Sequence, residues 1–182
     1  MKKFRVGIIG CTGMVGQRFA LILSRHPWFE ITALAASARS AGRTYAEAVD
    51  GRWKMTEPVP ELCAGMAVLD ATADIDRIVG LVDFVFCAVD MKKEEIRALE
   101  DLYAKHECPV VSNNSAHRWT PDVPMIIPEI NAGHAEVIPY QRKRLGTRRG
   151  FVAVKPNCSI QGYVPALHAL RDLGLERAAV CT

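Results

Sequence analysis

The fold is decided by Phe4-Arg5-Val6-Gly7-Ile8-Ile9-Gly10-Cys11-Thr12-Gly13-Met14-Val15-Gly16, a short apolar run that continues into regularly spaced glycines. The apolar run predicts a strand, and Val15, Phe19 and Ile22 predict a helix after it, because they recur at helical spacing. Strand, glycine turn and helix in this order are typical of a dinucleotide site, where glycines let the backbone approach a pyrophosphate at the helix N-terminus. An ordinary tight turn is the alternative for this motif alone. The candidate cofactor-binding residues here are Gly10, Thr12, Gly13, Met14, Val15 and Gly16.

The next predicted strand, residues 30–36, ends without the carboxylate that an NAD-binding fold usually presents to the ribose hydroxyls. Hydroxyl and guanidinium groups follow instead, at Ser37, Arg39 and Ser40. A ribose 2′-phosphate needs such groups, so the sequence favours NADP over NAD as the cofactor. A solvated polar loop is the alternative interpretation.

Strand and helix patterns then alternate. The pattern predicts strands at 67–69, 83–89 and 109–112, helices at 74–81 and 94–105, and a loop over 45–66. Elements alternating at this length predict an α/β fold, a doubly wound parallel sheet of the Rossmann type with right-handed crossovers. Ligands bind beyond the carboxyl ends of such strands, so Cys87, Ala88 and the segment Ser112-Asn113-Asn114 should face the cofactor, with Asn113 a candidate contact.

A single thiol, Cys158, lies between a predicted strand at 151–154 and a helix predicted over 159–173. At a helix N-terminus, the unpaired N–H groups and the helix dipole favour the thiolate, which is the nucleophilic form of cysteine. The same N–H groups could stabilise an oxyanion formed when the sulfur attacks a carbonyl. The alternative is a small buried side chain with no chemical role.

Two basic features have competing interpretations. Arg118 lies in a proline-rich irregular segment, 115–131, where its guanidinium could bind a phosphate or carboxylate, or could simply be solvated. Residues 141–149 hold five positive charges, but they lack interleaved aromatic residues, so we expect a solvated linker and no nucleic-acid partner.

The composition is typical of a soluble globular protein: 182 residues, 49% of them hydrophobic and 24% charged, with a net charge of +3. That charge is too small to imply a nucleic-acid or membrane partner, and no apolar run approaches the roughly 20 residues of a membrane helix. The glycines near residue 10 argue against a signal peptide. The six cysteines show no C-x-x-C pair, which indicates reduced cytoplasmic thiols and no structural metal site.

Four segments in register resemble the aspartate-β-semialdehyde dehydrogenases, in particular their archaeal and fungal branch, and the resemblance covers essentially the whole chain. The segments are the glycine turn at 10–16, the polar loop at 37–42, the block at 112–131 with Arg118 in it, and Pro156-Asn157-Cys158-Ser159.

This resemblance implies the NADPH-dependent reductive dephosphorylation of L-aspartyl-4-phosphate to the semialdehyde, in the pathway to lysine, threonine and methionine. It implies that Cys158 carries the acyl group as a thioester, that Arg118 binds the phosphate, and that Asn157 orients the substrate. Cys87 stands where the family often has a serine near the nicotinamide, so a hydrogen bond there is in question. The expected partners are a small-molecule substrate and, for a complete enzyme, further copies in a homodimer or homotetramer.

Family members have about twice this length, and their second half supplies an acid/base histidine, so we expect an N-terminal part that is inactive alone. We divide it into an NADP-binding domain at 1–150 and a nucleophile-bearing segment at 151–182, whose last residues, 178–182, would open another strand. Malonyl-CoA reductase, which has the same scaffold, is the alternative enzyme, whereas the block at 112–131 fits N-acetyl-γ-glutamyl-phosphate reductase poorly. A non-catalytic NADP-binding module is the alternative outside enzymes.

Overall fold

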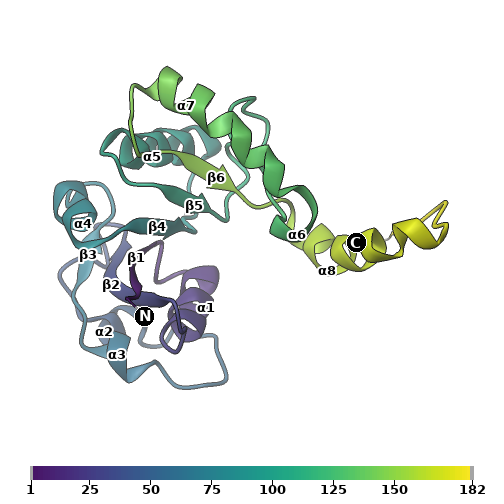
Figure 1. Cartoon of the computed structure of the whole chain (residues 1–182). Coiled ribbons are helices and arrows are strands. Elements are labelled where there is room, and N and C mark those ends of the chain that lie inside the picture. The colour runs from purple at the N-terminus through teal and green to yellow at the C-terminus, as the bar shows by residue number, and fades with distance from the viewer. Residues whose placement is uncertain (1, 181–182) are drawn as a thin grey trace.

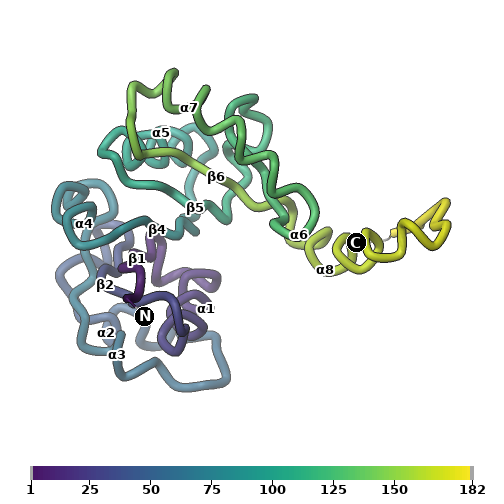
Figure 2. The backbone as a smooth tube through the Cα atoms, in the orientation of Figure 1, coloured from purple at the N-terminus to yellow at the C-terminus, as the bar shows by residue number. Residues whose placement is uncertain are grey.

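A computed structural model describes residues 2–180 of the protein. Within that range, six strands form one sheet in the order β3-β2-β1-β4-β5-β6, and every strand pair is parallel (Figure 1). The strands are β1 (Phe4–Ile9), β2 (Phe29–Ala36), β3 (Val68–Asp70), β4 (Phe84–Cys87), β5 (Val110–Ser112) and β6 (Val152–Val154). The chain winds outward from β1 to β3, then returns to place β4 on the other side of β1, a path that Figure 2 traces. The predicted doubly wound parallel sheet is confirmed.

The connections between strands are mostly helical. The helices are α1 (Met14–Leu23), α2 (Tyr45–Val49), α3 (Glu61–Ala64), α4 (Ile75–Leu81), α5 (Lys93–Lys105), α6 (Pro128–Asn131), α7 (Ile138–Leu145) and α8 (Cys158–Leu170), with 3₁₀ turns η1 (Ala132–Val137) and η2 (Arg171–Leu173). Crossover connections in parallel sheets are right-handed, so the direction in which the chain moves along the sheet decides which face a helix covers. The chain moves one way through α1 and the opposite way through α4, α5 and α7, so α1 lies on one face of the sheet and the other three helices lie on the other (Figure 1).

Each face of the sheet packs its own apolar cluster because neighbouring residues of a strand point to opposite faces. Ile8 of β1 joins the cluster that contains Ala20 of α1 and Tyr45 of α2. Ile9 joins the cluster that contains Ile78 of α4 and Leu99 of α5. Burial on both faces holds β1 at the centre of the sheet, and this fixes the position of the glycine turn that follows it.

The loop predicted over 45–66 is wrong in part, since it contains α2 and α3. Thr44 and Glu47 form a capping box at the start of α2, in which the Thr44 side chain accepts from the Glu47 N–H and Glu47 accepts from the Thr44 N–H. Trp53 anchors the loop that follows α2, because its ring N–H donates to the Glu57 carbonyl at 2.7 Å.

The solvated linker predicted over 141–149 is also wrong at its start, because 141–145 belong to α7. Gln141 is fully buried there, and its amide nitrogen donates to the carbonyls of Asp122 and Val152. Arg144 pairs with Asp122 through two hydrogen bonds. These contacts bind α7 to the sheet, and the basic residues on its outer side remain exposed.

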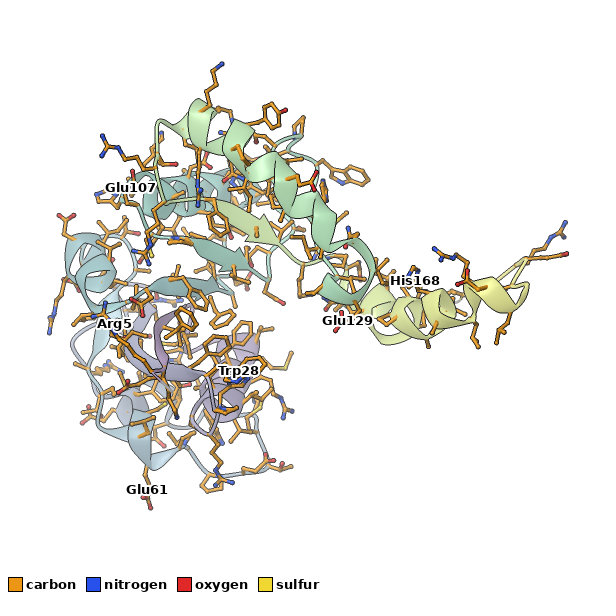
Figure 3. The ribbon with its side chains drawn as sticks, in the orientation of Figure 1. Arg5, Trp28, Glu61, Glu107, Glu129 and His168 are labelled. Atoms are coloured by element: carbon orange, nitrogen blue, oxygen red, sulfur yellow. The ribbon has the colours of Figure 1, made fainter. Side chains whose placement is uncertain are left out.

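The C-terminal part of the described chain extends away from the sheet. Figure 1 shows α8 beside α6, and Figure 3 marks the same place by His168 on α8 and Glu129 on α6. Residues 178–180 form no strand, and positions 181 and 182 of the strand predicted there lie outside the described residues. β6 pairs with β5 as part of the one sheet, and the domain boundary at residue 150 stays a prediction. Among residues 2–180, no helix is both long enough and apolar enough to cross a membrane.

Candidate cofactor and thiol site

The glycine turn joins β1 to α1 in a conformation that only glycine permits at two positions. Gly10 has a φ of +87°, and a Cβ there would lie 2.4 Å from the Ala88 carbonyl oxygen. A Cβ on Gly16 would lie 2.2 Å from the Gly10 carbonyl oxygen. The first and third glycines of the motif therefore let the turn pack against the end of β4 and against its own helix.

The middle of the turn is open to solvent and offers unpaired donors. Gly13 is the N-cap of α1 and has no side chain to cap it, so the first N–H groups of the helix lack the usual side-chain partner. Gly13, Met14 and Val15 are exposed. The buried Gln17 holds the turn from behind, since its amide nitrogen donates to the Thr12 carbonyl at 2.9 Å. This arrangement suits a pyrophosphate on the helix N-terminus.

The polar loop after β2 carries the candidate 2′-phosphate residues. Ser37 and Arg39 are exposed, whereas Ser40 is buried and its N–H donates to the Ser37 carbonyl at 2.8 Å. A cavity of about 270 Å³ opens beside the loop, and it is lined by Arg39, Ser40, Arg43, Glu47, Ala48, Asp50 and Arg52. The lining holds three guanidinium groups, which suit an anion, together with the carboxylates of Glu47 and Asp50. Arg43 belongs to the polar run that follows β2, whereas Arg52 was not singled out in the sequence.

The ends of β4 and β5 continue the carboxyl edge of the sheet. The Ala88 N–H donates to the Ile9 carbonyl at 2.8 Å, and the Asn113 N–H donates to the Cys87 carbonyl at 2.8 Å. The Cys87 side chain points into the interior and is 2% exposed. Burial, and then the nearby Glu100 carboxylate, raise the pKa of the Cys87 thiol well above its usual value. The Cys87 sulfur accepts a hydrogen bond from the Asn114 amide nitrogen, which lies 3.5 Å from it.

Cys158 is the first residue of α8 and is exposed. Asn157 caps the helix, with its side-chain oxygen accepting from the Ser159 N–H at 2.9 Å, from the Ser159 hydroxyl at 2.8 Å and from the Cys158 thiol at 3.6 Å. One N–H at the helix start is therefore already occupied by the cap. The other free cysteines of the described chain, Cys11, Cys63, Cys87 and Cys108, are buried, so Cys158 is the accessible thiol of this group.

Burial raises the pKa of the other thiols, and this distinguishes them from the exposed thiol of Cys158. The pKa of Cys63 rises to about 11 and that of Cys108 to about 12, and desolvation is the main cause for both. The pKa of Cys11 rises further, again because the thiol is buried. Thiolate chemistry near neutral pH is disfavoured at these positions. Cys11 is completely buried in the turn, which fits a packing role.

Arg118 is attached to the segment that bears the thiol. Its Nε donates to the Lys155 carbonyl at 3.1 Å, three residues before Cys158. Neither Arg118 nor Lys155 forms an ion pair among the described residues. The pKa of Lys155 is lowered, first by desolvation and second by repulsion from Arg118. The structure thus brings two unpaired cations to the start of α8, and Lys155 was not predicted from the sequence.

A larger cavity, of about 620 Å³, lies at the opposite edge of the sheet and is lined in part by Phe4, Phe84, Pro109 and Val111. These residues stand at or near the amino ends of β1, β4 and β5. Ligands of open parallel sheets bind beyond the carboxyl ends, so this cavity is not the candidate site. The adjacent strands β1, β4, β5 and β6 end at the carboxyl edge instead. The glycine turn, Ala88 and Asn113 follow the first three strands directly, and Cys158 begins α8 four residues after β6.

Comparisons with known proteins identify the family of this domain. A sequence profile of the family described as semialdehyde dehydrogenase, NAD binding domain, matches residues 5–138. The aspartate-semialdehyde dehydrogenase of Archaeoglobus fulgidus is 38% identical over 99% of this chain and 50% of its own, and that of Methanothermobacter thermautotrophicus is 42% identical over 92% and 46%. The crystal structure of the Candida albicans enzyme with NADP is 34% identical, with a TM-score of 0.80 over 96% of this chain and 48% of its own. The chain thus spans about half the length of these relatives.

Proposed function

The chain belongs to the semialdehyde dehydrogenase family by its NAD-binding domain, and we propose that it carries the cofactor site and nucleophile of an NADP-dependent aspartate-semialdehyde dehydrogenase. The observation that carries the proposal is the exposed thiol of Cys158 at the start of α8, on the same sheet edge as the glycine turn. The relatives from Archaeoglobus fulgidus and Methanothermobacter thermautotrophicus bear the name of that enzyme.

The residues of the chain fit NADP. Gly10 and Gly16 let the turn pack closely against the end of β4 and against α1, the first N–H groups of α1 lack a side-chain cap, and Arg39 and Arg43 line a cavity after β2. We assign the pyrophosphate to the N-terminus of α1 and the 2′-phosphate to the loop with Ser37, Arg39 and Ser40. The relative from Candida albicans was solved with NADP. When bound, NADPH supplies the hydride for the reduction.

The chain's own residues supply the first covalent step. The Cys158 thiolate attacks C4 of L-aspartyl-4-phosphate, a sulfur–carbon bond forms, and the carbon–oxygen bond to phosphate breaks. Arg118 and Lys155 are the cations that receive the departing phosphate, because they lie unpaired at the same helix start. Transfer of a hydride to the thioester carbon then breaks the carbon–sulfur bond, which releases the semialdehyde and restores the thiolate.

The acid/base group of the whole enzyme lies outside these residues in our proposal. None of the histidines is placed next to Cys158 by a hydrogen bond among the described residues. We assign the histidine, the second domain and the contacts of a homodimer or homotetramer to the further length that the relatives have. Free cysteines favour the cytoplasm as its compartment.

Two measurements on the 182-residue chain test this proposal. NADPH should bind more tightly than NADH, as followed by the fluorescence of the reduced cofactor. Arg39→Ala should remove most of the difference, whereas Arg25→Ala, just beyond the C-terminal end of α1, should leave it. Equal affinity for the two cofactors would contradict the assignment of the 2′-phosphate. In a hydride-transfer assay with semialdehyde, phosphate and NADP, we expect no turnover from this chain alone. Turnover at an ordinary enzymatic rate would refute the placement of the acid/base group.

A further inference from the structure

Glu100 is a buried carboxyl group that the proposed chemistry does not use. It lies on α5 and is 1% exposed. Its Oε1 accepts a short hydrogen bond from the Ser112 hydroxyl and a second, at 3.0 Å, from the side-chain nitrogen of Asn114. Ser112 in turn accepts from the Asn114 N–H at 3.0 Å. A carboxylate buried this completely is costly unless it is hydrogen-bonded, so a reason is needed for its position on α5, packed against the end of β5.

The contacts of Glu100 determine which way the Asn114 amide faces. The Glu100 Oε1 accepts from the Ser112 hydroxyl and from the Asn114 side-chain nitrogen, so Asn114 presents its NH₂ group to Glu100. The NH₂ group also reaches the Cys87 sulfur at 3.5 Å, a second acceptor. Both donor positions of the amide are therefore committed to the protein. The amide oxygen, Oδ1, accepts no hydrogen bond from any side chain or backbone group in residues 2–180.

The position of Asn114 in the fold identifies what that oxygen would meet. It follows β5, which lies between β4 and β6 in the sheet. The 2′-phosphate loop follows β2 and the glycine turn follows β1, so a dinucleotide whose adenosine lies over β2 extends its other half over β4 and β5. The strand after that, β6, leads to Cys158. Asn114 thus stands between the pyrophosphate site and the thiol, where the nicotinamide ring must lie.

We propose that Glu100 is a positioning residue that fixes the Asn114 amide so that its Oδ1 accepts a hydrogen bond from the carboxamide NH₂ of the nicotinamide. Glu100 touches neither cofactor nor substrate and acts through Asn114. The carboxamide NH₂ group only donates, so it needs an acceptor such as the Asn114 Oδ1. An Asn114 amide turned the other way would present a donor, which could meet only the carboxamide oxygen. The inference rests on the proposed NADP site and adds to it the two residues that orient the reactive ring.

The test compares two cofactors and four forms of the 182-residue chain. The cofactors are NADP and its 3-acetylpyridine analogue, in which a methyl group replaces the carboxamide NH₂. The forms are the parent chain, Asn114→Ala, Glu100→Gln and the control Glu94→Gln, which makes the same chemical change at an exposed position of α5. Dissociation constants are measured by calorimetric titration, and each variant is checked by thermal unfolding.

We expect the parent chain and Glu94→Gln to bind NADP about three- to tenfold more tightly than the analogue, which is the usual range for one hydrogen bond. In Asn114→Ala the ratio should fall to about one. In Glu100→Gln it should also fall, because glutamine can donate to Asn114 and let the amide turn over. A change in stability alone would weaken the binding of both cofactors equally and leave the ratio of their dissociation constants unchanged.

The outcomes separate this inference from the function on which it rests. If the parent chain binds no NADP, the proposed function fails and the inference fails with it. If the parent binds NADP but does not distinguish it from the analogue, only the inference is overturned. A ratio that stays at the parent value in Asn114→Ala, whose side chain is half-buried, overturns it even where Glu100→Gln does not fold.

Discussion

Replacing Gly13 by alanine separates the fold of the glycine turn from its ligand site. Gly13 has φ −74° and ψ 163°, which alanine adopts readily, and the new Cβ would lie 3.5 Å from its nearest neighbour, the Gly10 carbonyl oxygen. Alanine stabilises through the unfolded chain by about 0.4–1 kcal/mol. Against that, alanine is a poorer N-cap than glycine by several tenths of a kcal/mol to about 1 kcal/mol. The two effects nearly cancel, so we expect the unfolding temperature to change by a few degrees at most.

Cofactor binding should respond very differently to Gly13→Ala. The methyl group would stand on the exposed side of the turn, where the backbone must approach the pyrophosphate. One hydrogen bond to a charged group is worth about 1.5–3 kcal/mol, so its loss should weaken NADPH binding by about tenfold or more. Gly133→Ala, at an exposed glycine with open space around it, serves as the matched control: it should leave NADPH binding unchanged and, with no N-cap to weaken, raise the stability by about 0.4–1 kcal/mol.

Fluorescence titration with NADPH and urea denaturation of the same preparations measure the two effects. Gly16→Ala completes the set, because its Cβ would lie 2.2 Å from the Gly10 carbonyl oxygen and should cost about 3 kcal/mol of stability as well as binding. If Gly13→Ala folds normally and binds NADPH as tightly as the parent chain, the pyrophosphate does not lie over this turn and the reasoning is refuted.

Three further outcomes follow from other contacts. The Glu107 carboxylate, labelled in Figure 3, accepts from the N–H groups of Arg148, Arg149 and Gly150. These hydrogen bonds lower the pKa of Glu107 from a usual value of 4.5 to about 2. The stability that they give the fold is complete above pH 4.5 and is lost as the pH falls through about 2. Glu107→Gln should therefore lower the unfolding temperature at pH 7 but progressively less between pH 4.5 and 2, and a constant difference would contradict this. Gly150→Ala would bring a Cβ within 1.8 Å of the Ala104 carbonyl oxygen and should cost about 3 kcal/mol or more in urea denaturation, whereas an unchanged midpoint would show that the close packing is not real. The last prediction compares Cys181→Ser with the double variant Cys181→Ser, Arg118→Ala. Inorganic phosphate should slow the alkylation of Cys158 in the first and have little effect in the second. Equal slowing in both would show that Arg118 is not part of the phosphate site.

The sheet and the turn could be predicted because their signals are local. The apolar run of β1 and the glycines after it lie within thirteen neighbouring residues, 4–16, and each has a direct physical reason for its place. α2 was missed although a local signal existed, since Thr44 and Glu47 have the spacing of a capping box. A helix of five residues has too short an apolar pattern to stand out by periodicity.

The supporting contacts of the site could not be predicted because they join residues that are distant in sequence. Glu100 meets Asn114 only after α5 has packed against β5. Arg118 meets Lys155 across 37 positions, and Gln17 holds both the Thr12 carbonyl and, 35 positions away, the Arg52 carbonyl. Periodicity and motif spacing carry no information on such pairs, so the sequence proposes residues that would bear the chemistry but not those that orient them.

The central claim is that NADPH and the Cys158 thiol occupy one site at the carboxyl edge of the sheet. The most direct measurement is the rate at which iodoacetamide alkylates Cys158, followed by peptide mass spectrometry, with and without saturating NADPH. We predict that NADPH slows the alkylation of Cys158 several-fold in the parent chain, and that it no longer does so in Gly13→Ala at the same NADPH concentration. An unchanged rate of alkylation, with NADPH shown to be bound, would contradict it.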